Sequence, residues 1–424
     1  MSLALSPHDR ELLDGTHGDG AAFAMRLVVR AAEVTGAERL IDVTGAHVDS
    51  CLYHGEATLD FVRRLVDGRA HVRVPTTLNV GALDLLHPEL YRGDPGTAER
   101  GRLLMDRYRS LGARATFTCA PYQLAEARPS LGEQVAWGES NAIAFCNSVL
   151  GARTNRYGDF LDIAAAITGR VPDAGLHRTE ERRARLVLRL ASDVPAGLRD
   201  ADVLFPVLGI VLGRRAGSTV AVIDGLAPGQ SEDRLKALGA AAASSGSVAM
   251  FHVVGSTPEA QTLDEALQHR APERVDLIRL GELRAARDEL TGAAGERLVA
   301  VSLGTPHASL AELERYAAML GERSVHPEVE CVVSTGRDVM AAAADRGIVE
   351  HLREAGVEIL VDTCSYVAPI LRNAAGPVMT DSGKWAYYAP GNIGASVVFG
   401  SAADCIRSAV AGHVVRDLGP WGGA

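Results

Sequence analysis

The chain alternates strand-like apolar runs, polar loops and helical segments along most of its 424 residues. Helical patterns cover about 9–36, 56–67, 96–111 and 309–320, and strand-like runs cover about 40–43, 70–74, 115–119, 298–303, 377–380 and 396–399. Such alternation is typical of parallel or mixed sheets flanked by helices. Because a chain of this length exceeds one ordinary core, we expect a multi-lobed α/β fold.

Changes in composition divide the chain into three predicted lobes, at 1–190, 191–295 and 296–424. A charged stretch at 178–189 marks the first boundary. Between 200 and 290, apolar runs are interrupted by alanine-rich sequence, which indicates an inserted α/β lobe.

Charge and hydropathy exclude several classes of protein. The formal net charge is −10 and no basic run is present, which argues against nucleic-acid binding. No apolar stretch reaches the roughly 18 residues that span a bilayer, and the N-terminal residues lack the pattern of a signal peptide. Six irregularly spaced cysteines do not form a disulfide framework in a chain of this size. We therefore expect a cytoplasmic protein with reduced thiols.

Two cysteines occupy similar positions, each at the end of a strand-like run and each followed by a turn. They are Cys119 and Cys364, and strand ends in α/β proteins face ligand clefts. Thiolates there are suited to a soft metal or an iron–sulfur cluster. Cys51 follows a strand in a polar loop and is a candidate third ligand. The other cysteines, Cys146, Cys331 and Cys405, fit buried apolar positions better.

Several polar motifs have both a functional and a structural interpretation. Ser382-Gly383-Lys384 follows a strand and either binds an anion or forms an ordinary turn. His54 either faces a cleft or lies on the surface beside a capping Glu56. His307 is a ligand, an acid/base group or part of a turn. Arg153 either binds a carboxylate or makes a structural ion pair.

Together these segments resemble the aconitase X family, a divergent branch of the aconitase superfamily. The matching segments run from about residue 40 to 400: 46–47 with 53–56, 75–79, 118–122, 137–142, 147–155, 304–307, 362–364, and 382–384 with 388–391. The resemblance implies an aconitase-like fold and an iron–sulfur-dependent dehydratase, in which Cys119 and Cys364 match the cluster cysteines. Thr305 stands where the archaeal branch has a cysteine. This difference indicates that the chain resembles the bacterial branch more closely, and it makes Cys51 the best candidate for the replacement ligand. It also favours a 2Fe–2S cluster, and a 3Fe–4S cluster, a 4Fe–4S cluster and mononuclear iron are the alternatives.

Known members of the family act on cis-3-hydroxy-L-proline or, in archaea, on mevalonate 5-phosphate. By this resemblance Ser382 is expected to abstract the proton, with Lys384 and His54 as further catalytic groups. The predicted substrate-binding residues are Thr76, Thr77, Asn79, Ser140, Asn141, Arg153 and His307. Two alternatives to these known activities remain. One is an enzyme of the same family that uses the same cluster on a different substrate, and the other is a non-catalytic protein that binds a small acid or a partner.

Single-chain members of the family carry a small swivelling domain. We do not find its pattern in these 424 residues. The sequence is therefore expected to represent a large subunit that forms a heterodimer with a separate small subunit.

Overall fold

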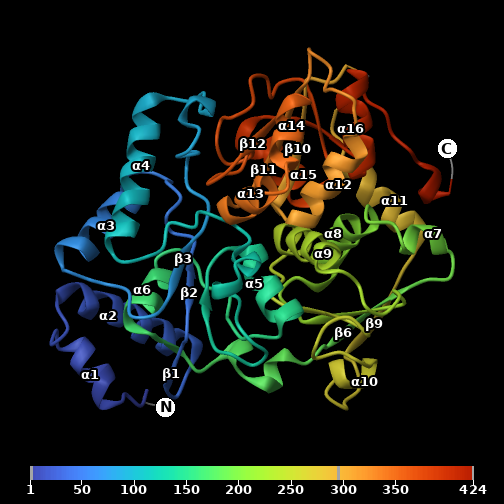
Figure 1. The fold of residues 1–424 in the computed structure, drawn as a ribbon. Helices are drawn as coiled ribbons and strands as arrows, with labels where there is room; N and C mark the ends of the chain where they lie inside the picture. Colours follow the sequence, from blue (N-terminus) through green and yellow to red (C-terminus); the bar gives the residue numbers. More distant parts are fainter. Residues whose placement is uncertain (1–2, 294–296, 423–424) are drawn as a thin grey trace. The chain divides into compact units, whose positions relative to one another are not determined.

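The computed structural model describes residues 3–293 and 297–422, which form two compact units. Unit 1 contains residues 1–83 and 94–183, and unit 2 contains residues 84–93 and 184–424. Each unit combines helices with parallel strands, which confirms the predicted α/β class (Figure 1). Among the described residues, no helix is both long enough and apolar enough to cross a membrane.

Unit 1 is built around short strands. A three-stranded parallel sheet has the order β3-β2-β4, and β1 pairs with β5 in an antiparallel ribbon. The strands are β1 Leu40–Asp42, β2 Ala46–Val48, β3 Thr76–Leu78, β4 Ala136–Trp137 and β5 Arg170–Pro172. The helices are α1 Pro7–Leu13, α2 Asp19–Thr35, α3 Glu56–Asp67, α4 Pro95–Ser110, α5 Ser140–Phe145 and α6 Leu161–Thr168, with a π turn at Cys146–Leu150.

The first helix of unit 1 is held to the rest of the unit by a buried charge. Ser6 caps α1, and Asp9 in its first turn is fully buried and pairs with Arg170 at 2.8 Å. This pair joins α1 to β5, 161 residues further along the chain. Arg170 and backbone N–H groups hold the pKa of Asp9 below its usual value, against the opposing effect of burial.

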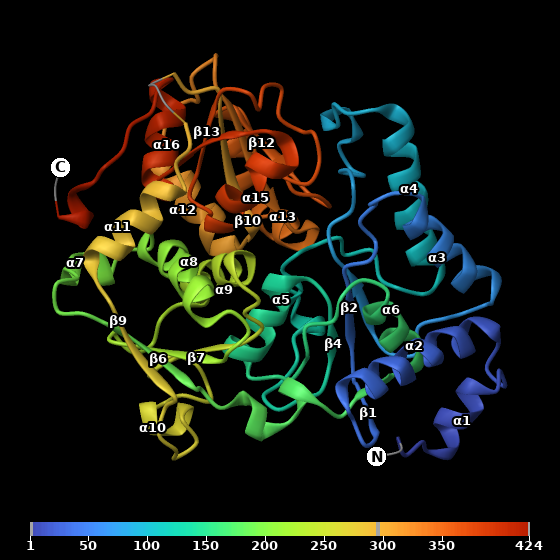
Figure 2. The ribbon, with the colours of Figure 1, turned by 180° about the vertical axis from the view of Figure 1, so that it is seen from behind.

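Unit 2 begins with a four-stranded parallel sheet in the order β8-β7-β6-β9. Its strands are β6 Leu186–Leu190, β7 Ala221–Asp224, β8 Phe251–Val253 and β9 Arg274–Ile278. Its helices are α7 Ala196–Arg199, α8 Leu204–Ala216, α9 Glu232–Ser245, α10 Leu263–Ala266 and α11 Leu280–Glu289. Helices α8 and α9 lie side by side in both views (Figures 1 and 2), and Gly209 allows their close approach because a Cβ there would lie 2.3 Å from the Leu238 carbonyl oxygen.

A five-stranded parallel sheet follows, in the order β12-β11-β10-β13-β14. Its elements in chain order are β10 Ala300–Ala308, α12 Leu310–Leu320, β11 Glu330–Thr335, α13 Arg337–Ala344, α14 Ile348–Glu354, β12 Val357–Leu360, β13 Pro377–Thr380, α15 Gly383–Ile393, β14 Ser396–Phe399 and α16 Ala402–Ala411. One apolar core joins these strands to α12, α14 and α16, and includes Val301, Val333, Leu313, Leu352 and Ile406. A fully parallel sheet needs cover on both faces, which explains its continuous apolar strands.

Several predicted elements differ from the structure. The predicted helix at 9–36 is divided into α1 and α2, because Gly15 and Gly18 adopt positive φ angles of 88° and 96° between them. The predicted strand at 70–74 is irregular, and the predicted loop at 75–79 contains β3. Residues 115–118 lie beside β3, where the Thr118 N–H donates to the Leu78 carbonyl, but they form no regular strand because Phe117 has a positive φ of 39°. Strand β3 is short and buries the polar residues Thr76 and Thr77, and hydropathy does not reveal such a strand.

Candidate active site

In unit 1, polar side chains gather where the parallel strands β2, β3 and β4 end. Asp49 directly follows β2, Asn79 directly follows β3, and Glu139 lies two residues after β4. The Asn79 amide donates a hydrogen bond to the Asp49 carboxylate. Glu139 caps α5 by accepting the Ala142 N–H at 2.8 Å, and it adopts a positive φ of 64°. Positive φ in a residue other than glycine often marks a functional position.

His47 on β2 lies beneath this group and is completely buried. Its Nδ1 lies 2.8 Å from the Thr77 hydroxyl, which in turn donates to the Ala46 carbonyl. Burial lowers the pKa of His47 to about 4, although the Glu139 charge and a hydrogen bond with Asn79 act in the opposite direction. The imidazole is neutral at physiological pH.

The carboxyl groups of this region are held in an environment that favours protonation. Burial raises the pKa of Asp49 to about 8, and the nearby charges of Glu139 and Asp159 add to the effect. Burial also raises the pKa of Asp162 to about 6, although Ser50 donates to its carboxylate. Asp49 at the end of β2 therefore holds its proton near neutral pH, and such a raised pKa is common at catalytic sites.

Cys119 ends the extended segment beside β3 and is 2% exposed. The Asn141 amide donates to the Cys119 carbonyl at 2.6 Å and accepts a hydrogen bond from the Tyr122 hydroxyl at 2.8 Å. The Tyr122 ring stacks on Phe145 of α5 with the ring centroids 3.7 Å apart. Asn141, predicted to bind substrate, thus fixes the backbone that carries Cys119.

Cys51 has a different environment. Its thiol is completely buried and lies 3.2 Å from the Asn79 carbonyl oxygen, with the Val48 carbonyl 3.7 Å away. Burial and the neighbouring acids Asp49 and Asp162 raise its pKa well above the ordinary value. Unlike a reactive thiol, Cys51 therefore stays protonated unless a metal ion lowers its pKa.

In unit 2, the ends of β10 and β12 bring His307 and Cys364 together. Their ligand atoms lie within 4.8 Å of one another, and both residues are completely buried. His307 Nε2 lies 3.1 Å from the Thr363 carbonyl oxygen, so that nitrogen carries the proton. Strands β10 and β12 lie on either side of β11 and run parallel to it, so they deliver these residues to the same edge of the five-stranded sheet.

Ser382 and Lys384 follow β13 at the same edge. Ser382 caps α15, and its Oγ accepts the Trp385 N–H at 3.0 Å. Both residues are buried, and the Lys384 ammonium lies 6.0 Å from the centre of the Tyr366 ring. The Trp385 indole donates to Ser365 at 3.0 Å, which ties this turn to the segment that carries Cys364.

Four other predicted residues lie away from the strand ends of unit 1, whereas Ser140 lies next to Glu139. Thr76 and Thr77 are on β3, upstream of Asn79; Thr76 donates to the Val74 carbonyl and Thr77 supports His47. Arg153 donates to the His177 carbonyl at 3.0 Å and to the Thr179 hydroxyl at 2.8 Å. His54 is exposed just before α3, and its charge lowers the pKa of Asp159 against the larger effect of burial. Ser140 is half-buried at the start of α5, next to Glu139.

Sequence reasoning assigned no role to His47, Asp49 or Glu139. Asp49 has the same position after its strand as Asn79, and that shared position was the available signal. Strand β2 has only three residues, too few to show a periodic pattern in the sequence.

Comparisons with known proteins agree with this geometry. Family profiles described as the aconitase X first, second and third domains match residues 2–180, 184–288 and 298–411. The chain is 42% identical to a cis-3-hydroxy-L-proline dehydratase of Pseudomonas aeruginosa, over 98% of this chain and 72% of that protein. It is 33% identical to a phosphomevalonate dehydratase large subunit of Methanosarcina mazei, over 96% and 97% of the two chains. The holo-form crystal structure of Thermococcus kodakaraensis aconitase X is similar, with a TM-score of 0.85, 31% identity and coverage of 96% of this chain and all of that chain. The protein belongs to the aconitase X family.

Proposed function

We propose that the protein is an iron–sulfur-dependent dehydratase, a hydro-lyase that removes water from cis-3-hydroxy-L-proline. The observation that carries this proposal is the 42% identity to the hydroxyproline dehydratases of Pseudomonas aeruginosa and Hypocrea jecorina over nearly the whole chain. The buried thiols of Cys119 and Cys364, and the raised pKa of Asp49, support the same chemistry.

Cys119 and Cys364 are the proposed cluster ligands, with Cys51 as the third. Thiolate sulfur is the usual ligand of iron–sulfur clusters, and buried cysteines at strand ends meet the need for a shielded site. His307 beside Cys364 offers an imidazole as an alternative third ligand. We favour a 2Fe–2S cluster because Thr305 stands where the archaeal branch of the family has a cysteine.

When bound, such a cluster supplies a Lewis acid for the departing hydroxyl. Ser382 is the proposed base that takes the proton from the neighbouring carbon. Its oxygen accepts an N–H group at the first turn of α15, where the helix dipole stabilises negative charge. The Lys384 ammonium, two residues on, lowers the cost of ionising the hydroxyl or binds the substrate carboxylate.

Unit 1 supplies the proposed polar contacts to the substrate. Asn79, Ser140 and Asn141 lie at or next to the strand ends, and Thr77 acts through His47. His54 remains a proposed acid/base group at the rim, and His307 is the proposed contact from unit 2. The assignments of Thr76 and Arg153 to the substrate stay predictions, because their hydrogen bonds are made within unit 1.

A separate small subunit is the proposed partner. The phosphomevalonate dehydratases among the relatives are named large subunits, and this chain covers 97% of the Methanosarcina mazei protein. The similarity to phosphomevalonate dehydratases also makes mevalonate 5-phosphate a second candidate substrate. A phosphate ester requires more cationic groups than Lys384 and Arg153, which favours hydroxyproline.

The cluster is tested by measuring iron, acid-labile sulfide and the visible spectrum of protein purified without oxygen. About two iron and two sulfide per chain are expected for the 2Fe–2S cluster. Cys119→Ala and Cys364→Ala should each abolish loading, whereas Cys405→Ala, at a buried core position, should retain it. Full loading of either site variant would refute the ligand assignment, and Cys51→Ser compared with His307→Ala identifies the third ligand.

The substrate is tested by assaying the loaded protein with cis-3-hydroxy-L-proline and with mevalonate 5-phosphate, each with and without the small subunit. Turnover of the hydroxyproline supports the leading proposal, and turnover of only the phosphate ester replaces it. A protein that takes up no iron but binds a small acid belongs to the non-catalytic alternative.

A further inference from the structure

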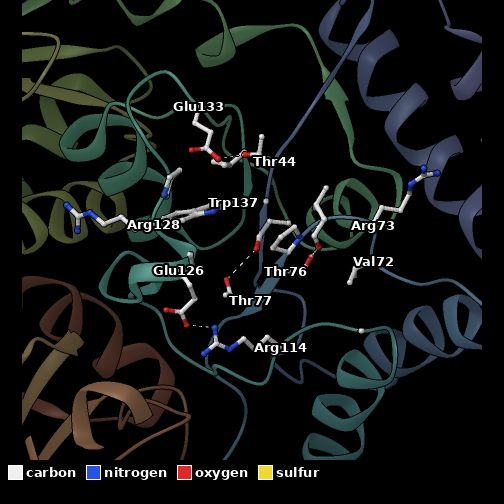
Figure 3. Close-up of a pocket in the computed structure, with 18 of the residues that line it drawn as sticks. Thr44, Val72, Arg73, Thr76, Thr77, Arg114, Glu126, Arg128, Glu133 and Trp137 are labelled. Carbon is white, nitrogen blue, oxygen red and sulfur yellow. Dashed lines mark hydrogen bonds and ion pairs between the residues drawn. The ribbon is translucent and has the colours of Figure 1, made fainter. Parts of the chain in front are cut away.

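Unit 1 contains a cavity of about 400 Å³ at the edge where its parallel strands begin. Its lining includes Thr44 and Gly45 before β2, Pro75 before β3 and Val135 before β4. The volume lies within the range of small-molecule sites in proteins. In Figure 3, Trp137, Thr76 and Thr77 lie between the side chains of Arg73 and Arg128, which extend on opposite sides of the cavity.

The direction of the strands separates this cavity from the candidate active site. Strands β2, β3 and β4 are parallel, so their first residues share one edge and their last residues share the other. The cavity lies at the edge where the strands begin, whereas Asp49, Asn79 and Glu139 lie at the edge where the strands end. The segment beside β3 follows the same direction: Arg114 at its start lines the cavity, and Cys119 at its end belongs to the candidate active site.

Polar and apolar side chains both line the cavity, and the apolar ones provide a surface for a ring or chain. Val72, Val74 and Pro75 line it, together with Pro129 and the indole of Trp137. A flat apolar ring or short chain is suited to such a lining.

The charged groups at the rim favour an anion. Arg73, Arg114 and Arg128 all line the cavity, together with Glu126 and Glu133. Both acids are engaged: Glu126 pairs with Arg114, while Glu133 accepts the Thr44 hydroxyl at 2.5 Å and the Ser130 N–H at 2.8 Å. Arg73 is exposed, and its guanidinium makes no hydrogen bond or ion pair within residues 3–293 and 297–422. An exposed guanidinium at the rim of a cavity is suited to bind a carboxylate or phosphate.

We propose that this cavity binds a small organic anion, a carboxylate or phosphate ester attached to an apolar ring, at a site separate from the active site. The ring packs against Trp137 and the prolines, and the anionic group lies at the rim with Arg73. Two residues that line the cavity contact His47. The Thr77 hydroxyl lies 2.8 Å from His47 Nδ1, and the centre of the Trp137 ring lies 5.9 Å from the centre of the imidazole. A bound anion therefore contacts residues that hold His47 in place.

The proposal is tested by isothermal titration of the full chain with sodium benzoate and with phenyl phosphate. Benzyl alcohol, the same ring without charge, is the matched probe. We expect saturable binding of both anions and at least about tenfold weaker binding of the alcohol, because a charge-assisted hydrogen bond contributes about this factor. Arg73→Ala should weaken binding of the anions about tenfold and leave the alcohol unchanged.

A second variant and a matched control complete the test. Ala127→Phe places a ring in the cavity from its half-buried lining and should abolish binding of all three probes. Arg102→Ala removes an exposed arginine of α4 outside the cavity and should change nothing. Equal binding of benzoate and benzyl alcohol, or binding that survives both cavity variants, would overturn the proposal. It would also be overturned if the cavity variants raised KM for cis-3-hydroxy-L-proline in step with the loss of benzoate, since the cavity would then be the substrate site.

Discussion

Asp362 is the residue that holds the segment before Cys364 in place. It has a positive φ of 63°, and its side chain is completely buried. Its carboxylate pairs with Arg337 at 2.5 Å through both oxygens and accepts the Leu85 N–H at 3.0 Å. Burial nevertheless raises its pKa, because desolvation outweighs the arginine. The ion pair with Arg337 and the hydrogen bond from Leu85 therefore both hold Asp362, two residues before Cys364.

Replacing Arg337 with methionine should destabilise the protein by about 2 kcal/mol, because it leaves a buried carboxylate without its charged partner. Denaturant unfolding measures the loss. The double variant Arg337→Met/Asp362→Asn, which retains an acceptor for Leu85, should recover most of it. A double variant no more stable than the single one would show that the ion pair is not the cause.

Asp381, next to the proposed base, predicts a dependence of stability on pH. Burial, with the nearby Glu312 charge, raises its pKa to about 7, so the folded protein binds a proton that the unfolded chain releases near pH 4. Its stabilising contribution is complete below about pH 4, decreases as the pH rises and is lost above about 7. The melting temperature of Asp381→Asn should therefore fall less than that of the wild type between pH 5 and 7.5. Parallel profiles for the two proteins would contradict the assignment.

At the scale of elements, β10 shows how one strand reaches the site. Its register against β11 shifts between Leu303 and Ala308, and Gly304 at the shift has a φ of 76°. A Cβ at Gly304 would lie 2.1 Å from the Ser334 carbonyl oxygen. Only glycine therefore allows β10 to bend there before it delivers His307.

Gly304→Ala should destabilise the protein by about 3 kcal/mol, since it combines an unfavourable φ with a clash against backbone. Gly197→Ala is the matched control, because nothing lies within 4 Å of its added Cβ and α7 is helical there. Chemical denaturation should place the control within about 0.5 kcal/mol of the wild type. Equal effects of the two substitutions would mean that β10 can rearrange.

At the scale of the molecule, the segments matched by the second and third family domains share a buried charge network in unit 2. Lys236 of α9 is 3% exposed and pairs with Glu312 of α12 and with Asp233. Its ammonium also lies 3.4 Å from the carbonyl oxygen of His307. Both lysines of this chain, Lys236 and Lys384, are buried. The network therefore links α9, which belongs to the four-stranded sheet, to His307 at the end of a strand in the five-stranded sheet.

Lys236→Met should cost about 3 kcal/mol, because two acids lose their buried partner. Adding Glu312→Gln should restore part of that stability. Arg346→Met breaks an exposed pair with Glu314 on the same α12 and should cost less than about 0.5 kcal/mol. Unfolding monitored by tryptophan fluorescence compares the three variants, and a loss no larger than that of Arg346→Met would count against the network.

The sequence alone determined the α/β class, the family and the positions of Cys119, Cys364 and Ser382 after strand-like runs, because local hydropathy and short motifs carry that information. Only the tertiary structure decided which polar residues meet. Thr77 and Asn79 are two residues apart, yet Thr77 lines the cavity at one edge of the sheet while Asn79 meets Asp49 at the other. His47 and Thr77 form a pair across strands that are 30 residues apart in the chain. Such contacts depend on strand order and register, which arise from long-range packing and leave no periodic pattern in the chain.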